Sequence, residues 1–159
     1  MTENKTINLV GELIGRKSLS GIVKALCGQQ LGFGCYRDVY ELKQNSQYVV
    51  KIQRDASDGM FANVTEWRNW INNERWDFLS NYLAPCLLIT NNGRVLIQKR
   101  VTFKSKELYP KYIPAMFTDL KISNFGWIKE RFVCCDYAYI PLAFVQKGKS
   151  KMQQVKWID

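Results

Sequence analysis

The spacing of apolar residues changes along the chain, from a helical period near its beginning to strand-like alternation further on. Residues 1–28 predict two helices, the second running from a cap at Ser18 to a stop at Gly28. From Leu31 onward, short apolar runs separated by polar turn residues predict strands. These strands are expected at 37–43, 48–53, 87–90 and 94–99, with the last two joined by Asn91-Asn92-Gly93.

The rest of the chain is less regular. A longer helix is predicted at 61–79, with an apolar face made of Trp67, Trp70, Ile71 and Phe78. Residues 101–118 are expected to be helical from Ser105, with interruptions at Pro110 and Pro114. A tight hairpin is expected around Lys129-Glu130, followed from Gln146 by a basic, mobile tail. The pattern thus divides the chain into a helical segment 1–30, a strand-rich part 31–100, a mixed part 101–145 and a tail 146–159.

Composition narrows the chemistry available to the chain. Its 159 residues fit one domain or two small lobes, and a hydrophobic share of 47% indicates a folded protein. There is no histidine, which excludes a Ser-His-Asp or Cys-His nucleophile and a histidine-ligated metal. The net charge of +9 favours an anionic partner such as a nucleotide or a nucleic acid, although solubility alone also accounts for it.

The cysteines and the apolar runs indicate in which cellular compartment the protein is expected. The chain has five cysteines in no CxxC spacing, and we expect reduced, mostly buried thiols in a cytoplasmic protein. The first residues lack the apolar run of a signal peptide, and no stretch reaches the roughly 18 apolar residues of a membrane span. We therefore expect no membrane partner.

Four groups of residues carry candidate chemistry, and three of them precede residue 100. Gly32 and Gly34 form a GxG between strands, where phosphate can approach a backbone that has no side chain. Lys51 ends the next apolar strand and can reach such a phosphate. An acid on the following helix, Glu66 in first place and Glu74 in second, would hold that lysine extended. Taken singly, these residues are more often a tight turn, a strand end and an exposed helix acid than parts of a site.

The fourth group follows the mixed region. Asp119, Lys121 and Asn124 lie in the run DLKISN, and Asp136 follows a short hairpin. Two carboxylates and one amide are all oxygen donors, which suit a hard cation such as Mg²⁺. Lys121 can stabilise charge on a phosphoryl group during transfer.

In this order the four groups resemble the motifs of the protein kinase family. Asp119–Asn124 is similar to the catalytic loop DLKxxN, and Asp136 opens a DYA where the family has DFG. Val49-Val50-Lys51 resembles the VAIK strand, and the segment around Gln98 resembles the hinge whose backbone receives adenine. The residues that resemble the glycine-rich loop are Gly32, Gly34, Arg37 and Val39.

The resemblance implies a fold and a set of cofactors. The fold would be α+β and protein kinase-like, with a twisted antiparallel N-lobe sheet and one helix over 31–100. A vestigial C-lobe over 101–145, braced by the N-terminal helices, would carry the catalytic loop and hairpin. The cofactors would be ATP and Mg²⁺. A looser similarity links the compact form to small kinase-like proteins encoded by bacteriophages.

The resemblance also implies a role for each site residue. Asp119 would accept the proton of an acceptor hydroxyl, and Lys121 would neutralise the γ-phosphate. Asn124 and Asp136 would hold Mg²⁺, while Lys51, paired with Glu66, would fix the α- and β-phosphates.

The chain departs from the family pattern at several positions. Phe117-Thr118 stands where the family writes His-Arg, so Thr118 cannot receive a phosphorylated activation loop. Arg37 replaces the third glycine of the loop, and Ala138 replaces the glycine of DFG. Only a short segment follows Asp136, and it has no APE motif. These departures leave little platform for a protein substrate.

Three functional hypotheses follow. The first is a small Mg-ATP-dependent phosphotransferase that acts on itself, a small molecule or a partner. The second is a catalytically inactive kinase-fold binding module, for instance a phage inhibitor of a host protein, which the many aromatic residues favour. The third is nucleic-acid binding, motivated by the charge and the basic stretch 94–111 but without a recognisable RNA- or DNA-binding motif.

Overall fold

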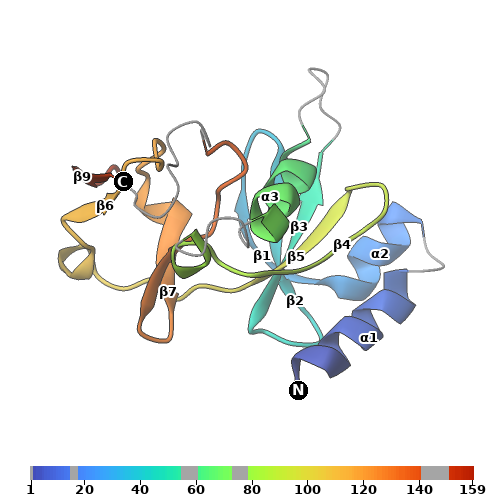
Figure 1. Cartoon of the computed structure of the whole chain (residues 1–159). Coiled ribbons are helices and arrows are strands. Elements are labelled where there is room, and N and C mark those ends of the chain that lie inside the picture. The colour runs from blue at the N-terminus through green and yellow to red at the C-terminus, as the bar shows by residue number, and fades with distance from the viewer. Residues whose placement is uncertain (1, 15–17, 55–60, 73–78, 141–150) are drawn as a thin grey trace. The chain divides into compact units, whose positions relative to one another are not determined.

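The computed structural model describes residues 2–14, 18–54, 61–72, 79–140 and 151–159, which form a mixed α/β protein with antiparallel sheets (Figure 1). The chain divides into two compact units. The first consists of Met1–Trp67 and Cys86–Arg100, and the second of Arg68–Pro85 and Val101–Asp159. No helix within the described ranges is long and apolar enough to cross a membrane.

A five-stranded antiparallel sheet in the order β1-β2-β3-β5-β4 forms the centre of the first unit. The predicted strands and hairpins of this part are confirmed, including the Asn91-Asn92-Gly93 turn, where Gly93 has a φ of 70°. The prediction of helix up to residue 28 was wrong at its end, because β1 begins at Cys27 and pairs with β2 from there. The strands are β1 (Cys27–Phe33), β2 (Arg37–Leu42), β3 (Tyr48–Gln53), β4 (Cys86–Ile89) and β5 (Val95–Lys99).

One face of this sheet is apolar and is covered by α1 (Glu3–Ile14) and α2 (Leu19–Leu26). The hydroxyl of Ser18 accepts a hydrogen bond from the Gly21 amide at 3.3 Å, so the predicted cap of α2 is confirmed. Val10, Leu26 and Val50 are each fully buried in one apolar core of the first unit. The two N-terminal helices therefore pack on the sheet of the first unit. That they brace the part after residue 100 stays a prediction.

The opposite face mixes polar and apolar side chains, because side chains alternate across a strand. Lys51 and Gln53 lie there, away from Val50, and Leu96 stands directly opposite Lys51. The buried side of helix α3 (Ala62–Ile71) is mostly polar, since Asn63, Glu66 and Asn69 accompany Ala62. The predicted apolar helix face was therefore wrong: Ile71 is 47% exposed and the two tryptophans are half-buried. Phe78, the last residue of that predicted face, lies outside the described residues.

The second unit contains two small two-stranded sheets. The predicted hairpin is confirmed as β7 (Phe125–Ile128) and β8 (Arg131–Cys134), with Lys129 in the turn at a φ of 57°. The other sheet pairs β6 (Tyr112–Pro114) with β9 (Met152–Gln154), which lie side by side in Figure 1. The described part of the second unit also contains the single helical turns η2 (Leu79–Asn81), η3 (Lys106–Leu108) and η4 (Ile122–Asn124).

Two predictions for the second unit were wrong. Residues from Ser105 form only η3 and then the extended strand β6, because proline fixes an extended-compatible φ and supplies no amide donor to a helix. In the tail that was predicted to be mobile, residues 152–154 form β9 and pair in register with β6, while 146–150 lie outside the described residues. The sequence gives little sign of this strand, because Met-Gln-Gln shows no alternation of apolar and polar positions.

Aromatic rings supply much of the packing in the second unit. The Tyr109 ring meets the Trp127 ring edge-on at 4.8 Å and the Trp157 ring at 5.3 Å between centroids. Phe125 stacks on Phe132 at 5.7 Å. Such pairs contribute about 0.5–1.5 kcal/mol each beyond the area they bury. A residue close to the chain end, Trp157, is thus part of this cluster.

Replacing Gly126 by alanine is expected to destabilise the protein by about 1–3 kcal/mol. A Cβ at that position would lie 2.8 Å from Val101 and 3.0 Å from the Thr102 carbonyl, so the neighbouring segment must shift. Gly11 in α1 is the matched control, because a Cβ there meets nothing within 4 Å and alanine favours a helix. Urea denaturation of both variants tests this, and equal effects would contradict the close approach.

All five cysteines are reduced thiols, as expected, and Cys27, Cys86 and Cys134 are buried. Burial raises the pKa of the Cys27 thiol to about 11, and the charge of Lys43 only partly opposes this. Cys27 is therefore a protonated and unreactive core residue at neutral pH.

Candidate functional site

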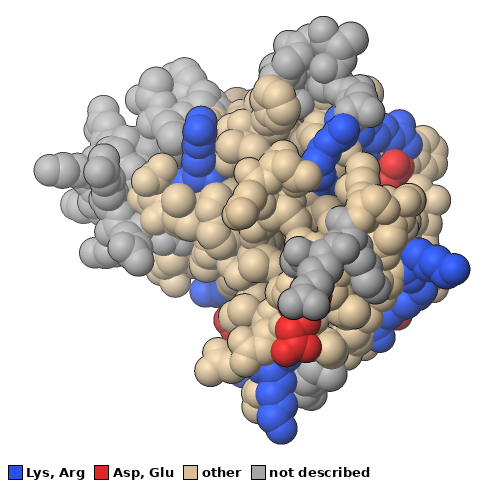
Figure 2. Space-filling view, turned by 90° about the vertical axis from the view of Figure 1, so that its right-hand side faces the viewer, with Lys and Arg blue, Asp and Glu red and all other residues tan. Residues whose placement is uncertain are grey.

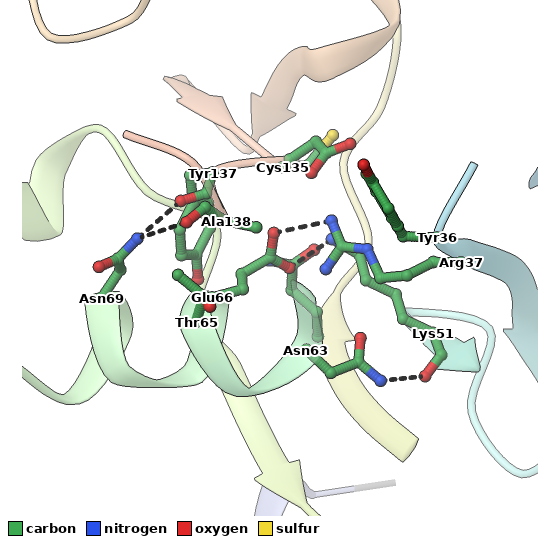
Figure 3. Close-up of polar contacts among 12 residues, drawn as sticks. Tyr36, Arg37, Lys51, Asn63, Thr65, Glu66, Asn69, Cys135, Tyr137 and Ala138 are labelled. Carbon is green, nitrogen blue, oxygen red and sulfur yellow. Dashed lines mark hydrogen bonds and ion pairs between the residues drawn. The ribbon is translucent and has the colours of Figure 1, made fainter. Parts of the chain in front are cut away.

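A buried cluster of charged and amide side chains surrounds Glu66 in the first unit. The Lys51 ammonium contacts Oε1 of Glu66 at 2.5 Å, and the Arg37 guanidinium contacts Oε2 at 3.1 Å (Figure 3). The amide of Gln98 donates a hydrogen bond to the same Oε1 at 3.2 Å. All four side chains are buried. The structure therefore pairs Lys51 with Glu66, while Glu74, the second candidate, lies outside the described residues.

The two cations keep Glu66 ionised. Burial by itself would raise the pKa of this carboxyl, but the charges of Arg37 and Lys51 and their hydrogen bonds outweigh it. The pKa therefore lies below its usual value of 4.5. Because the folded state has the lower pKa, the ion pairs stabilise the protein fully above about pH 4.5 and lose that effect as the pH falls through the folded pKa.

Asn63 fixes the position of Glu66 relative to the sheet. Its side-chain amide donates to the backbone carbonyl of Lys51 at 3.1 Å, as Figure 3 shows, and to those of Gly93 and Arg94 at 3.2 Å. Its backbone amide donates to Oε1 of Gln53 at 3.1 Å, so a strand side chain caps the helix. Sequence reasoning missed Asn63. The signal that could have found it is a run of buried polar residues at intervals of three along the helix.

Gln98 does not lie in a hinge. It belongs to β5, whose backbone pairs with β3 on one side and β4 on the other: Gln98 stands opposite Val49 and Cys86. The expectation that adenine binds this backbone is corrected accordingly, because an inner strand has no open backbone edge. Its contribution to the cluster is its side chain, buried against Glu66.

The glycine turn lies between β1 and β2. Gly32 stands opposite Val39, and the Gly34 amide donates to the Arg37 carbonyl at 2.8 Å, which closes the turn. A Cβ added at Gly32 would meet nothing within 4 Å, and at Gly34 only the Arg37 carbonyl at 3.8 Å. The space over this backbone is therefore open.

The predicted catalytic and metal-binding residues belong to the second unit. Asp119 and Lys121 form an exposed ion pair at 3.6 Å, with 57% and 58% of their side chains accessible. The backbone carbonyl of Asn124 accepts a hydrogen bond from the Cys135 amide at 2.8 Å. Since β7 starts directly after Asn124 and Asp136 follows Cys135, Asn124 and Asp136 stand at the same end of the hairpin.

The donor set at this end of the hairpin fits a hard cation. Asp119 and Asp136 are exposed carboxylates, and the Asn124 amide nitrogen donates weakly to the Asp119 carbonyl at 3.5 Å. This leaves the Asn124 amide oxygen as an acceptor. Within the described residues, no three acidic or thiol side chains cluster closely enough to bind a metal by themselves. A cation at this place would therefore depend on the amide and on ligands from outside the protein.

The backbone after Asp136 is held firmly. The Asn69 side-chain amide donates to the carbonyl of Tyr137 at 2.9 Å and to that of Ala138 at 3.2 Å (Figure 3). The Tyr137 hydroxyl donates to the Ala84 carbonyl at 2.7 Å, and only 1% of Tyr137 is exposed. Asn69, like Asn63, belongs to the polar side of α3 that sequence reasoning missed.

The candidate residues thus form two groups, one in each unit. The described structure brings together Arg37, Lys51, Glu66 and Gln98 in the first, with Gly32, Gly34 and Val39 in the adjacent hairpin. It brings together Asp119, Lys121, Asn124 and Asp136 in the second.

Among the described residues seen in Figure 2, lysines and arginines lie at several places on the face, with uncharged and some acidic residues between these places. Two of the basic residues in 94–111 form ion pairs with acidic residues: Arg100 pairs with Glu41 at 2.5 Å and Lys106 with Asp159 at 2.7 Å. These observations give nucleic-acid binding no specific support.

The chain was compared with family models, curated protein sequences and solved structures. No family model and no curated protein sequence matches the chain. Among solved structures, it is similar to that of a ternary complex of streptomycin, ATP and APH(2")-IIa, with a TM-score of 0.39 and 17% sequence identity. The similar part covers 65% of this chain and 30% of that chain. A likeness of this extent is compatible with the mixed α/β fold described above and identifies no activity.

Proposed function

We propose that this chain is a kinase-like protein that binds Mg-ATP and transfers a phosphoryl group to an acceptor hydroxyl. The observation that carries the proposal is the buried ion pair between Lys51 on β3 and Glu66 on α3. Protein kinases need a lysine on the corresponding strand and a glutamate on the following helix in contact, because the glutamate holds the lysine toward the α- and β-phosphates.

Two further observations support nucleotide binding. The turn at Gly32 and Gly34 leaves open space over its backbone, so phosphate oxygens can approach its amides. Arg37, in place of the family's third glycine, brings a second cation to Glu66. Two cations on one carboxylate favour an anionic ligand nearby.

The second group of residues supplies the transfer chemistry in this proposal. Asp119 accepts the proton of the acceptor hydroxyl, whose oxygen forms a bond to the γ-phosphorus as the bond from that phosphorus to the ADP oxygen breaks. Lys121 balances the charge on the γ-phosphoryl oxygens. Asn124 and Asp136 hold Mg²⁺, which when bound neutralises phosphate charge. The acceptor is the chain itself, a small molecule or a partner protein.

Thermal denaturation with and without Mg-ATP tests the proposal. A ligand at about 100 times its dissociation constant stabilises the folded state by about 2.7 kcal/mol, which raises the Tm by roughly 5–10 °C for a chain of this length. We expect Lys51→Met to lose this rise and Lys5→Met, an exposed lysine on α1, to keep it. No rise at millimolar ATP, or an equal rise in Lys51→Met, would contradict nucleotide binding at this site.

The second candidate function, a kinase-fold binding module without catalysis, is favoured by aromatic side chains that stand in solvent. Phe33 is 80% exposed and Phe61 60%, and Phe103 and Tyr112 are each 57% exposed. Aromatic residues are enriched at protein interfaces. A chain that is stabilised by Mg-ATP and yet transfers no phosphate to any acceptor would support this second function.

A further inference from the structure

The segment 151–159 runs beside the part of the chain that leads into the candidate catalytic loop. Its strand β9 pairs with β6, and the Lys151 carbonyl accepts a hydrogen bond from the Ala115 amide at 2.7 Å. The Val155 amide donates to the Lys111 carbonyl at 3.0 Å. The pairing is therefore continuous along 111–115.

Beyond this pairing, the segment contacts the backbone on both sides of Asp119. On the near side, the Gln153 side-chain amide donates to the Phe117 carbonyl at 2.7 Å. On the far side, the Ile158 amide donates to the Leu120 carbonyl at 3.1 Å, and the Ile158 carbonyl accepts from the Ile122 amide at 2.8 Å. These contacts fix the backbone, while the side chains of Asp119 and Lys121 stay more than half exposed.

Trp157 adds a packing contact at the end of the same loop. Its ring lies 5.0 Å from that of Phe125, the residue that follows Asn124. The Trp157 indole nitrogen donates to the Pro110 carbonyl at 3.1 Å, which fixes the ring orientation. Loop residues from Phe117 to Phe125 are thus held at three points by one segment.

We propose that 151–158 is a positioning segment for the catalytic loop, with Gln153 and Ile158 as its positioning residues. This proposal rests on the proposed function, because the segment would hold the loop in place for the phosphoryl transfer in which Asp119 and Lys121 act. None of these residues needs to touch a ligand. They act by holding the loop backbone in one arrangement, and a misplacement of about 1 Å in such a group can reduce a rate about 100-fold.

Ile158→Pro in the full chain removes the backbone amide that donates to the Leu120 carbonyl. The side chain at this position is exposed, and proline, like isoleucine, is apolar, so the character of the surface is kept. Ile158→Ala is its control, because it keeps the amide and removes only the exposed side chain. We expect Ile158→Pro to lower kcat for phosphoryl transfer at least tenfold with the KM for ATP within twofold. Amide hydrogen exchange of 119–124 should rise at least tenfold. Ile158→Ala should match wild type in kcat, in the KM for ATP and in the amide exchange of 119–124.

Gln153→Met and Gln154→Met provide a second pair that does not alter the backbone. Gln153 donates to Phe117, whereas its neighbour Gln154 has an exposed side chain. We expect the same loss of kcat and faster exchange only in Gln153→Met. Unchanged exchange and kcat in both Ile158→Pro and Gln153→Met would overturn the proposal. If the wild-type chain transfers no phosphate, the proposed function fails, and the exchange rates alone then decide whether the segment holds the loop.

Discussion

Replacing Glu66 by alanine is expected to lower the free energy of unfolding by about 3–5 kcal/mol, because Arg37 and Lys51 would lose a shared carboxylate while remaining buried. For a chain of this size such a loss lowers the Tm by roughly 10 °C. Thermal and urea denaturation of the purified variant measure it. This is the largest stability effect that we expect from a single charged residue of the described structure.

Glu41→Ala is the matched control for this prediction. Glu41 also forms a 2.5 Å pair, with Arg100, but about a third of each side chain is exposed. Solvent and salt screen such pairs, so a loss below about 1 kcal/mol is expected. Equal losses in the two variants would show that burial of the Glu66 cluster has no energetic consequence.

The pH dependence supplies a second check on Glu66. Because its folded pKa lies below 4.5, the difference in stability between wild type and Glu66→Ala should be constant above about pH 4.5. It should shrink as the pH falls through the folded pKa, where wild-type Glu66 takes up a proton. A difference that grows on acidification would contradict the lowered pKa.

Replacing Asp119 by asparagine is expected to reduce phosphoryl transfer at least 100-fold, because the amide cannot accept the proton of the acceptor hydroxyl. Asparagine has nearly the same shape, and the Asp119 side chain is 57% exposed, so the fold should be retained. Transfer of radiolabelled phosphate from ATP measures the rate. The rise in Tm with Mg-ATP should persist, since Lys51 and Glu66 are intact.

Glu130→Gln controls for the loss of one exposed negative charge. Glu130 lies in the turn between β7 and β8 and has an exposed side chain. The Glu130→Gln variant should transfer phosphate at the wild-type rate. Transfer by Asp119→Asn at the rate of Glu130→Gln would exclude Asp119 as the proton acceptor.

The strands and hairpins of this protein could be predicted because their signals are local. Asn91-Asn92-Gly93 and Lys129-Glu130 mark turns within a few residues, and alternation along 48–53 marks a strand. The contact between Lys51 and Glu66 was also expected, but from the order of the kinase-like motifs rather than from either residue alone.

The polar side of α3 and the pairing of β9 could not be predicted in the same way. A helix is expected to bury its apolar residues, yet α3 buries Asn63, Glu66 and Asn69, because their partners are polar groups distant in sequence. Likewise Met152–Gln154 becomes a strand only because β6 offers it a backbone edge. The position of Gln98 on an inner strand could not be predicted either, because it depends on the pairing of β5 with both β3 and β4.

The strand order β1-β2-β3-β5-β4 has a consequence for how the protein folds. Neighbours such as Glu41 and Val49 meet across a short turn, whereas α3 and most of the β4–β5 hairpin lie between Tyr48 and Lys99 in the sequence. Closing that long loop carries the greatest entropic cost in the sheet, since the cost grows with loop length. The contact between β3 and β5 also places Gln98 beside Glu66. The slowest pairing of the sheet and the completion of the charged cluster are therefore one and the same event, so the site forms only when the sheet closes.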